Sequence, residues 1–155
     1  MQDFSYLMPA RIVLERGAIE KLGELIPKVG NVTVVTGRSF ARRTGLCDRL
    51  ESILRKAGVR EVSFGSASPN PTVSEVEAAG QLARESGAEL VIGMGGGSAM
   101  DAAKAAAVLA TNRKPLMELF PIHRFEHAPL PLVCIPTTAG TGSETTQYAI
   151  INNDE

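Results

Sequence analysis

The chain has 155 residues, 44% of them hydrophobic, which is enough for one domain with a real core, and we treat residues 1–155 as that domain. Its 16 basic and 17 acidic residues are intermixed and give a formal net charge of −1, so neither a nucleic-acid partner nor a membrane surface is favoured. No apolar run is long enough to span a bilayer, and the first residues, Met1–Tyr6, lack the basic and apolar pattern of a signal peptide, so we expect none. Cys47 and Cys134 fit no metal-binding motif, so we expect a reduced, cytoplasmic protein.

The first half of the chain alternates between extended and helical patterns. A β-branched run predicts a strand buried on both faces, and apolar residues at helical spacing predict helices. In chain order we expect a strand at Arg11–Leu14, a helix over Ala18–Lys28 with Pro27 near its end, a strand at Val32–Thr36, a helix from Leu46 to Leu54 stopped by Gly58, and a strand at Arg60–Phe64.

The second half continues the alternation. Pro69-Asn70-Pro71 predicts a rigid turn, and Thr72 with Glu75 fits a capping box at the start of a helix. After that helix, which Gly87 closes, we expect a strand at Glu89–Met94, a helix from Ala99 to Ala110, a loop over Lys114–Pro131, a strand at Leu132–Ile135, a loop at Thr137–Glu144 and a strand at Thr145–Ile151. This order predicts an α/β fold with a doubly wound, mainly parallel, Rossmann-like sheet.

The central candidate site is the glycine turn, Gly95-Gly96-Gly97-Ser98, between an apolar strand and a helix. Glycines let backbone amides approach an anion, and the helix N-terminus adds unpaired donors. We expect Ser98 to cap the helix, with Asp101 either completing a capping box or serving the cofactor, and Lys104 either paired with Asp101 or solvated. A turn that only joins two elements stays an alternative. The spacing is neither the dinucleotide fingerprint nor a P-loop.

Three further segments follow predicted strands. Gly37 ends the strand at Val32–Thr36, Asn70 follows the strand at Arg60–Phe64, and the loop Thr137–Ser143, rich in hydroxyls, follows the strand at Leu132–Ile135. Ligands of open α/β sheets gather beyond the carboxyl ends of the strands. These segments and the glycine turn therefore predict one cleft that suits an extended ligand bearing phosphates.

Together these motifs resemble one family. The glycine turn continued by Asp101 and Lys104, the segment Pro136–Glu144, the turn Pro69-Asn70-Pro71 and the opening Pro9–Ala18 are similar to the iron-containing (group III) alcohol dehydrogenases. The resemblance implies an oxidoreductase that uses a nicotinamide dinucleotide on small alcohols or aldehydes. It implies these cofactor-binding residues: Gly37, Ser39, Asn70, Gly95, Gly96, Gly97, Ser98, Asp101, Thr137, Thr138 and Thr141.

One departure concerns the choice of cofactor. NAD-preferring members of the family tend to carry an acidic residue where this chain has Gly37. A carboxylate there would accept a hydrogen bond from the ribose 2′-OH and repel a 2′-phosphate. Gly37-Arg38-Ser39 offers instead backbone amides, a cation and a hydroxyl, with Arg42 and Arg43 nearby, so we expect NADP to be slightly favoured over NAD. The alternative is that these arginines are solvated.

A second departure is length. The family's helical second half, with an aspartate and three histidines that bind iron, has no counterpart here, so the fragment itself is expected to bind cofactor without turning over substrate. His123 and His127 match no family ligand, and we expect no metal there. Alternatives are a relative resembling glycerol dehydrogenase or dehydroquinate synthase, and a stand-alone nucleotide-binding module. A homodimer through Arg11–Leu14 is a further expectation.

Overall fold

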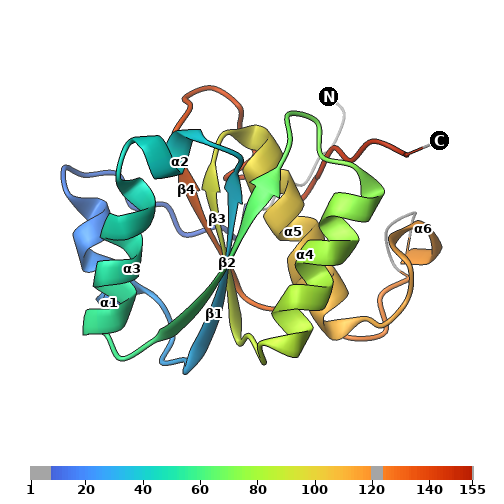
Figure 1. The fold of residues 1–155 in the computed structure, drawn as a ribbon, viewed down its shortest axis with the longest axis horizontal. Helices are drawn as coiled ribbons and strands as arrows, with labels where there is room; N and C mark the ends of the chain where they lie inside the picture. The colour runs from blue at the N-terminus through green and yellow to red at the C-terminus, as the bar shows by residue number, and fades with distance from the viewer. Residues whose placement is uncertain (1–7, 120–123, 155) are drawn as a thin grey trace, which may run out of the picture.

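The computed structural model describes residues 8–119 and 124–154 and shows one parallel sheet between two layers of helices (Figure 1). Within these residues the sheet has the strand order β2-β1-β3-β4, and every neighbouring pair is parallel. This confirms the predicted Rossmann-like α/β fold. In chain order the elements are η1 (Ala18–Lys21), α1 (Leu22–Leu25), β1 (Asn31–Gly37), α2 (Phe40–Arg43), α3 (Leu46–Lys56), β2 (Arg60–Ala67), α4 (Val73–Glu85), β3 (Leu90–Gly95), α5 (Gly97–Thr111), α6 (Leu116–Leu119) and β4 (Leu132–Pro136).

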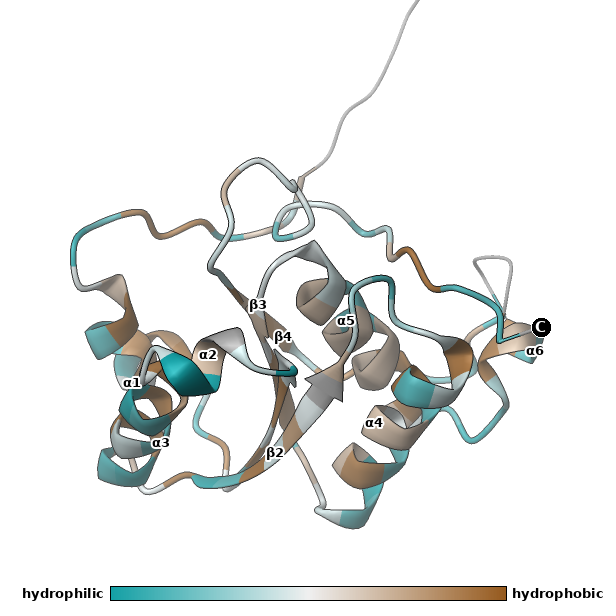
Figure 2. Ribbon diagram, turned by 45° about the horizontal axis from the view of Figure 1, so that its top comes forward, coloured by the Kyte–Doolittle hydropathy of each residue, from teal (hydrophilic) through white to brown (hydrophobic). Residues whose placement is uncertain are grey.

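The two faces of the sheet are covered by different helices. Helices α1, α2 and α3 lie on one face, and α4 and α5 lie on the other (Figure 1). Alternate residues of β3 divide between the two cores: Ile92 and Met94 join the core with α3, whereas Val91 packs against α5. Figure 2 shows the matching pattern on α3 and α4, whose apolar sides face the sheet. Burial on both faces explains why β1 and β3 read as continuous apolar runs.

Helix α5 approaches β3 closely at Gly93. A Cβ at this glycine would lie 2.7 Å from Ala103 Cβ and 3.2 Å from Met100 Cα. Alanines make up much of α5, and their small side chains allow the helix backbone to come near the strand. The close packing of β3 and α5 fixes where the first turn of the helix lies. In the described part of the chain, no helix is both long and apolar enough to cross a membrane.

Two predicted strands are wrong. Arg11–Leu14 has no strand conformation, and Ile12 and Leu14 are 59% and 95% exposed. A β-strand needs a hydrogen-bonded neighbour, and no described strand of this chain pairs with this segment. Thr145–Ile151 is also irregular, and only Asn152 makes an isolated bridge, to Thr72. Apolar and β-branched composition was not sufficient to place either segment in the sheet.

The predicted helix over Ala18–Lys28 is shorter than expected. Its first turn is the 3₁₀ helix η1, and its α-helical part ends at Leu25. Ile26 is extended, with φ −82° and ψ 154°, because the following Pro27 disfavours the helical conformation for the residue before it. The segment Lys114–Pro131, expected as a loop, includes the short helix α6, and residues 120–123 lie outside the described structure.

Candidate functional site

The N-terminus of α5 is the centre of the candidate site. The helix begins at Gly97 with Gly96 as its N-cap, and no side chain caps it, so the expectation that Ser98 is the N-cap is wrong. The first amides of a helix have no acceptor within the helix. The Ala99 amide donates to the Gly96 carbonyl at 3.1 Å. Because Gly96 has no side chain to accept from the Gly97 and Ser98 amides, these two donors and the positive end of the helix dipole stay available to an anion.

Helix α4 provides a contrast within the same fold. Its N-cap Thr72 accepts a hydrogen bond from the Glu75 amide, and the Glu75 carboxylate accepts one from the Thr72 amide, which confirms the predicted capping box. The Ser74 amide donates to Asp154 Oδ2 at 2.7 Å, so this helix end is capped by two carboxylates. Of these two helices, α5 alone offers its first amides to a ligand.

The loop Thr137–Ser143, called the hydroxyl loop below, lies against the glycine turn. The Thr137 amide donates to the Gly95 carbonyl at 2.8 Å. A Cβ at Gly96 would lie 3.4 Å from Thr138 Oγ1, and one at Gly97 would lie 3.3 Å from Thr141 Cβ. The hydroxyl loop and the glycine turn therefore form two adjacent walls of the candidate site, and larger residues in the turn would push these two segments apart.

The turn after β2 reaches the same place. Asn70 has a left-handed backbone, with φ 57°, and its amide donates to Ser98 Oγ at 3.2 Å. The Glu75 carboxylate fixes this turn by accepting hydrogen bonds from Ser68 and Thr72. It also accepts one from Arg38, which lies just beyond the end of β1. Burial alone would raise the pKa of Glu75, but the hydrogen bonds outweigh burial and hold its pKa below the ordinary value. The anionic carboxylate thus joins two strand ends.

The ends of β1, β3 and β4 surround a pocket of about 300 Å³, lined by Gly37, Ala41, Met94, Gly95, Gly96, Thr137 and Thr138. Strands β1 and β3 are neighbours here, and a Cβ at Gly95 would lie 3.8 Å from the Gly37 amide nitrogen. The chain leaves β1 toward β2 on one side and later returns through β3 on the other. This reversal of strand order is where open α/β sheets bind ligands.

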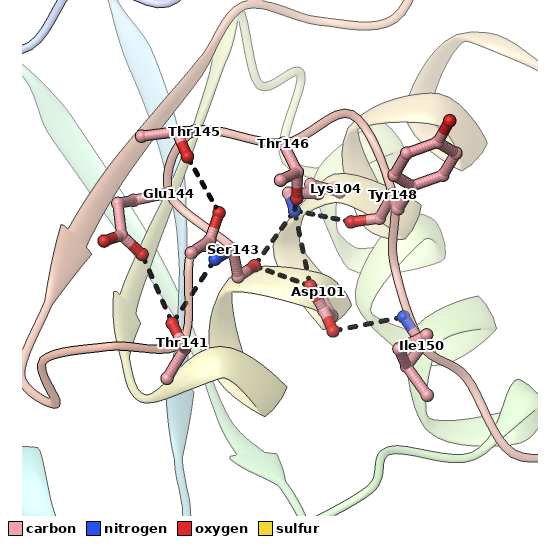
Figure 3. Close-up of polar contacts among 10 residues, drawn as sticks. Asp101, Lys104, Thr141, Ser143, Glu144, Thr145, Thr146, Tyr148 and Ile150 are labelled. Atoms are coloured by element: carbon pink, nitrogen blue, oxygen red, sulfur yellow. Dashed lines mark hydrogen bonds and ion pairs between the residues drawn. The ribbon is translucent and has the colours of Figure 1, made fainter.

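Asp101 and Lys104 lie behind the pocket on α5 and not on its wall. They form the expected ion pair, 3.3 Å between Lys104 Nζ and Asp101 Oδ1, and both side chains are only 11% exposed. Figure 3 shows both pointing toward residues 143–150, where Ser143 Oγ donates to Asp101 Oδ1 at 2.6 Å and the Ile150 amide donates to Asp101 Oδ2 at 3.1 Å. The alternative of a solvated lysine is wrong.

The structure brings most of the predicted cofactor residues together. Gly37, Gly95, Gly96, Thr137 and Thr138 line the pocket. Next to this lining, Gly97 approaches Thr141 and the Asn70 amide donates to Ser98. Ser39 is exposed at the start of α2 and is not among the lining residues. Sequence reasoning missed Ala41, Met94 and the partners of Asp101 and Lys104. Ala41 gave no signal beyond small size, but the buried lysine had one, since a charged residue interrupts an alanine-rich helix.

No metal centre is visible in the described chain. Across residues 8–119 and 124–154, no three or more His, Cys, Asp or Glu side chains lie together in a way that could hold a metal ion. His127 is tied through its backbone to Asn112, whose Oδ1 accepts from the His127 amide at 3.0 Å. His123 lies outside the described residues. The described side chains therefore do not fit an iron ion.

The parallel sheet, the uncapped helix and the pocket at the reversal of strand order define a Rossmann-like α/β domain. The model of the iron-containing alcohol dehydrogenase family matches residues 9–155. The chain therefore belongs to the iron-containing alcohol dehydrogenase family, as its motifs predicted.

Individual relatives agree with the family match. The chain is 37% identical to the NADH-dependent butanol dehydrogenase B of Clostridium acetobutylicum over 155 residues, which cover 99% of this chain and 40% of that protein. It is 30% identical to the NAD-dependent methanol dehydrogenase of Bacillus methanolicus, with 96% and 39% covered.

A solved structure gives the same result. The NADH-dependent butanol dehydrogenase A of Thermotoga maritima is 33% identical and superposes with a TM-score of 0.91, covering 99% of this chain and 39% of the other. The chain thus spans about 40% of the length of the relatives that it matches.

Proposed function

We propose that this chain is the dinucleotide-binding part of an alcohol dehydrogenase that acts on small alcohols or aldehydes. The observation that carries the proposal is the meeting of three strand ends, those of β1, β3 and β4, around one pocket, beside a helix N-terminus that has no side-chain cap. A pyrophosphate is the ligand group that such amides and close glycines suit best. The family match and the NAD-dependent names of the relatives support the same cofactor class.

The residues have distinct tasks in this proposal. The glycine turn with Ser98 holds the pyrophosphate, and Thr137, Thr138, Thr141 and Asn70 border the cofactor. Gly37 and Ser39 lie beside the adenine ribose, and Asp101 contributes from behind the pocket. A nicotinamide dinucleotide bound there accepts or donates a hydride. The chain's own residues bind and orient the cofactor and keep its pyrophosphate out of bulk water.

Turnover is not expected of the chain by itself. The described residues offer no cluster that could hold a metal ion, and metal-assisted polarisation of an alcohol oxygen needs one. Purified chain with NAD⁺ or NADP⁺, with a primary alcohol and with or without added Fe²⁺, should produce no reduced cofactor. A steady increase in absorbance from reduced nicotinamide would contradict this part of the proposal.

The choice between NAD and NADP is proposed to depend on Gly37. A Cβ there would meet only the Ala67 carbonyl oxygen, at 3.8 Å, so the fold has room for a side chain at the pocket. Arg38, next in sequence, carries a cation and is paired with Glu75 at 3.1 Å. The wild-type chain is expected to bind NADP⁺ at least as tightly as NAD⁺, because no carboxylate opposes the 2′-phosphate.

The test is a Gly37→Asp variant, with Gly37→Ala as the matched control that adds a Cβ without charge. Two like charges about 4 Å apart repel by roughly 1 to 4 kcal/mol, so Gly37→Asp should weaken NADP⁺ binding about tenfold or more and leave NAD⁺ binding equal or tighter. Calorimetric titration with both cofactors measures this. Tighter binding of NAD⁺ than NADP⁺ by the wild-type chain would contradict the NADP proposal, and no binding of either would contradict the proposed function.

A further inference from the structure

Asp101 and Lys104 are unusual because a buried ion pair contributes little to stability by itself. They are three residues apart on α5, and each side chain is 11% exposed. An exposed pair at this spacing would serve the helix as well at no desolvation cost. Both charged side chains instead point toward polar groups of residues 143–150, as Figure 3 shows. The role of the pair is therefore found in what it contacts.

Lys104 holds this segment at several points. Its Nζ donates to Ser143 Oγ at 2.9 Å, to the Tyr148 carbonyl at 2.6 Å and to Thr146 Oγ1 at 3.5 Å. Because an ammonium group only donates, Ser143 accepts from Lys104 and gives its own proton to Asp101. Each of the two charges thus orients the same hydroxyl, and Ser143 is the last residue of the hydroxyl loop.

Asp101 completes the attachment from the other side. Its Oδ2 accepts from the Ile150 amide, so both a carbonyl and an amide of residues 148–150 are bound by α5 side chains. A segment held in this way has no need of a sheet partner, which gives the physical reason why Thr145–Ile151 is not a strand. The amides of Thr145 and Thr146 both donate hydrogen bonds to the Gly142 carbonyl.

The attachment determines where the hydroxyl loop lies. One end of the loop is fixed by β4, since Thr137 donates to Gly95, and the other end is fixed by Ser143. Between these two points Thr138 and Thr141 lie exposed beside Gly96 and Gly97. Loss of the second attachment would leave the loop held by β4 on one side and, on the other, only by the more distant contacts of Asn152 and Asp154 with the start of α4.

We propose that Asp101 and Lys104 are positioning residues that hold the hydroxyl loop against the glycine turn, so that this side of the binding site is already formed when the dinucleotide binds. The proposal rests on the proposed function. Binding to a site that is formed in only a fraction of molecules weakens in proportion to that fraction. If loss of the pair leaves about one molecule in ten with the loop in place, the dissociation constant rises roughly tenfold.

The experiment compares Lys104→Met with Lys21→Met, which removes an exposed lysine paired to Glu15 at 2.6 Å on η1, outside the pocket lining. Dinucleotide affinity and amide hydrogen exchange are measured on each chain. Lys104→Met is expected to bind about tenfold more weakly and to exchange faster at residues 141–150, while β3 keeps its protection. Lys21→Met should match the wild type in both measurements.

Two milder variants keep the test decisive if Lys104→Met fails to fold. Ser143→Ala removes only the shared hydroxyl and should give the same changes at smaller size, whereas Lys104→Arg keeps the cation and should restore binding. Unchanged affinity and exchange in a folded Lys104→Met or Ser143→Ala chain would overturn the proposal while the wild-type chain still binds. If the wild-type chain does not bind dinucleotide, the proposed function is overturned first, and the exchange of residues 141–150 still shows whether the pair holds the loop.

Discussion

At the scale of single residues, the glycines near the pocket differ in the space that surrounds them. Gly93 and Gly37 lie on neighbouring strands, and nothing in the sequence shows how much space surrounds either of them. A Cβ at Gly93 would enter the backbone and side chains of α5, whereas a Cβ at Gly37 would make one ordinary contact. One glycine is needed for packing, and the other leaves room for a side chain at the pocket.

Gly93→Ala is therefore expected to destabilise the fold. The new methyl group would lie 2.7 Å from Ala103 Cβ in a fully packed core, and overpacking of this kind costs about 1 to 3 kcal/mol. Urea unfolding followed by circular dichroism measures the loss. Gly37→Ala is the control and should unfold within about 0.5 kcal/mol of the wild type. Equal stability of the Gly93→Ala and wild-type chains would mean that α5 can move away from β3.

Sequence reasoning identified the residues of the pocket better than their individual roles. The three consecutive glycines were predicted at an anion site because their pattern follows a strand and opens a helix, and the pocket does include Gly95 and Gly96. Ser98 was misassigned, since a serine after glycines suits an N-cap equally well by sequence. Its hydroxyl instead accepts from Asn70, which is 28 residues away, and no local pattern could indicate that contact.

At the scale of elements, α4 depends on a carboxylate that also joins neighbouring turns. Glu75 completes the capping box of α4, accepts from Ser68 at 2.6 Å and pairs with Arg38. Its pKa is below the ordinary value because these hydrogen bonds outweigh burial. The stabilisation is therefore present above the ordinary glutamate pKa of about 4.3 and is lost as the pH falls through the lower folded value.

Glu75→Gln tests this dependence. The neutral amide keeps the size of the side chain and loses the charge, so the variant should be less stable than the wild type at pH 7, and the difference should shrink as the pH falls below about 4. Urea unfolding at several pH values between 7 and 3 measures it. Glu24→Gln, at an exposed position of α1, controls for the loss of one carboxylate. A difference that grows as the pH falls would contradict the prediction.

Strands and helices with neighbours of their own were predictable, and segments that depend on distant side chains were not. Val32–Thr36 and Leu132–Ile135 lie inside β1 and β4 because their composition suits a two-sided core. Thr145–Ile151 has a similar composition but is bound by Asp101 and Lys104. Arg11–Leu14 has the apolar pattern of a strand, but no strand among the described residues lies beside it, so the segment has no backbone to pair with.

At the scale of the whole molecule, the four most exposed large apolar side chains of the described residues lie in two separate segments. Ile12 and Leu14 lie in the segment before η1, and Tyr148 and Ile150, 61% and 67% exposed, lie beyond the hydroxyl loop. Exposed apolar groups that are adjacent in sequence often mark a surface that another chain covers. The homodimer expected from the segment Arg11–Leu14 stays a prediction.

A Leu14→Asp variant tests that prediction. The leucine is 95% exposed, so the change should leave the unfolding midpoint within error of the wild type and weaken self-association, because a carboxylate opposes burial in an interface. Sedimentation velocity over a range of concentrations measures the association. Ile150→Asp is the matched control on the other exposed segment. A wild-type chain that stays monomeric at all concentrations would contradict the prediction.

The contacts of Asp101 and Lys104 also bear on the order in which the fold forms. Their partners Ser143, Tyr148 and Ile150 lie 39 to 49 residues further along the chain, whereas the capping box of α4 joins residues three apart. Contacts between distant residues form late, and a growing polypeptide folds from its N-terminus. During synthesis, β1, β3 and the glycine turn would therefore be in place before the hydroxyl loop leaves the ribosome. The nascent chain would pass through a stage in which the glycine turn is formed and the hydroxyl loop does not yet lie against it.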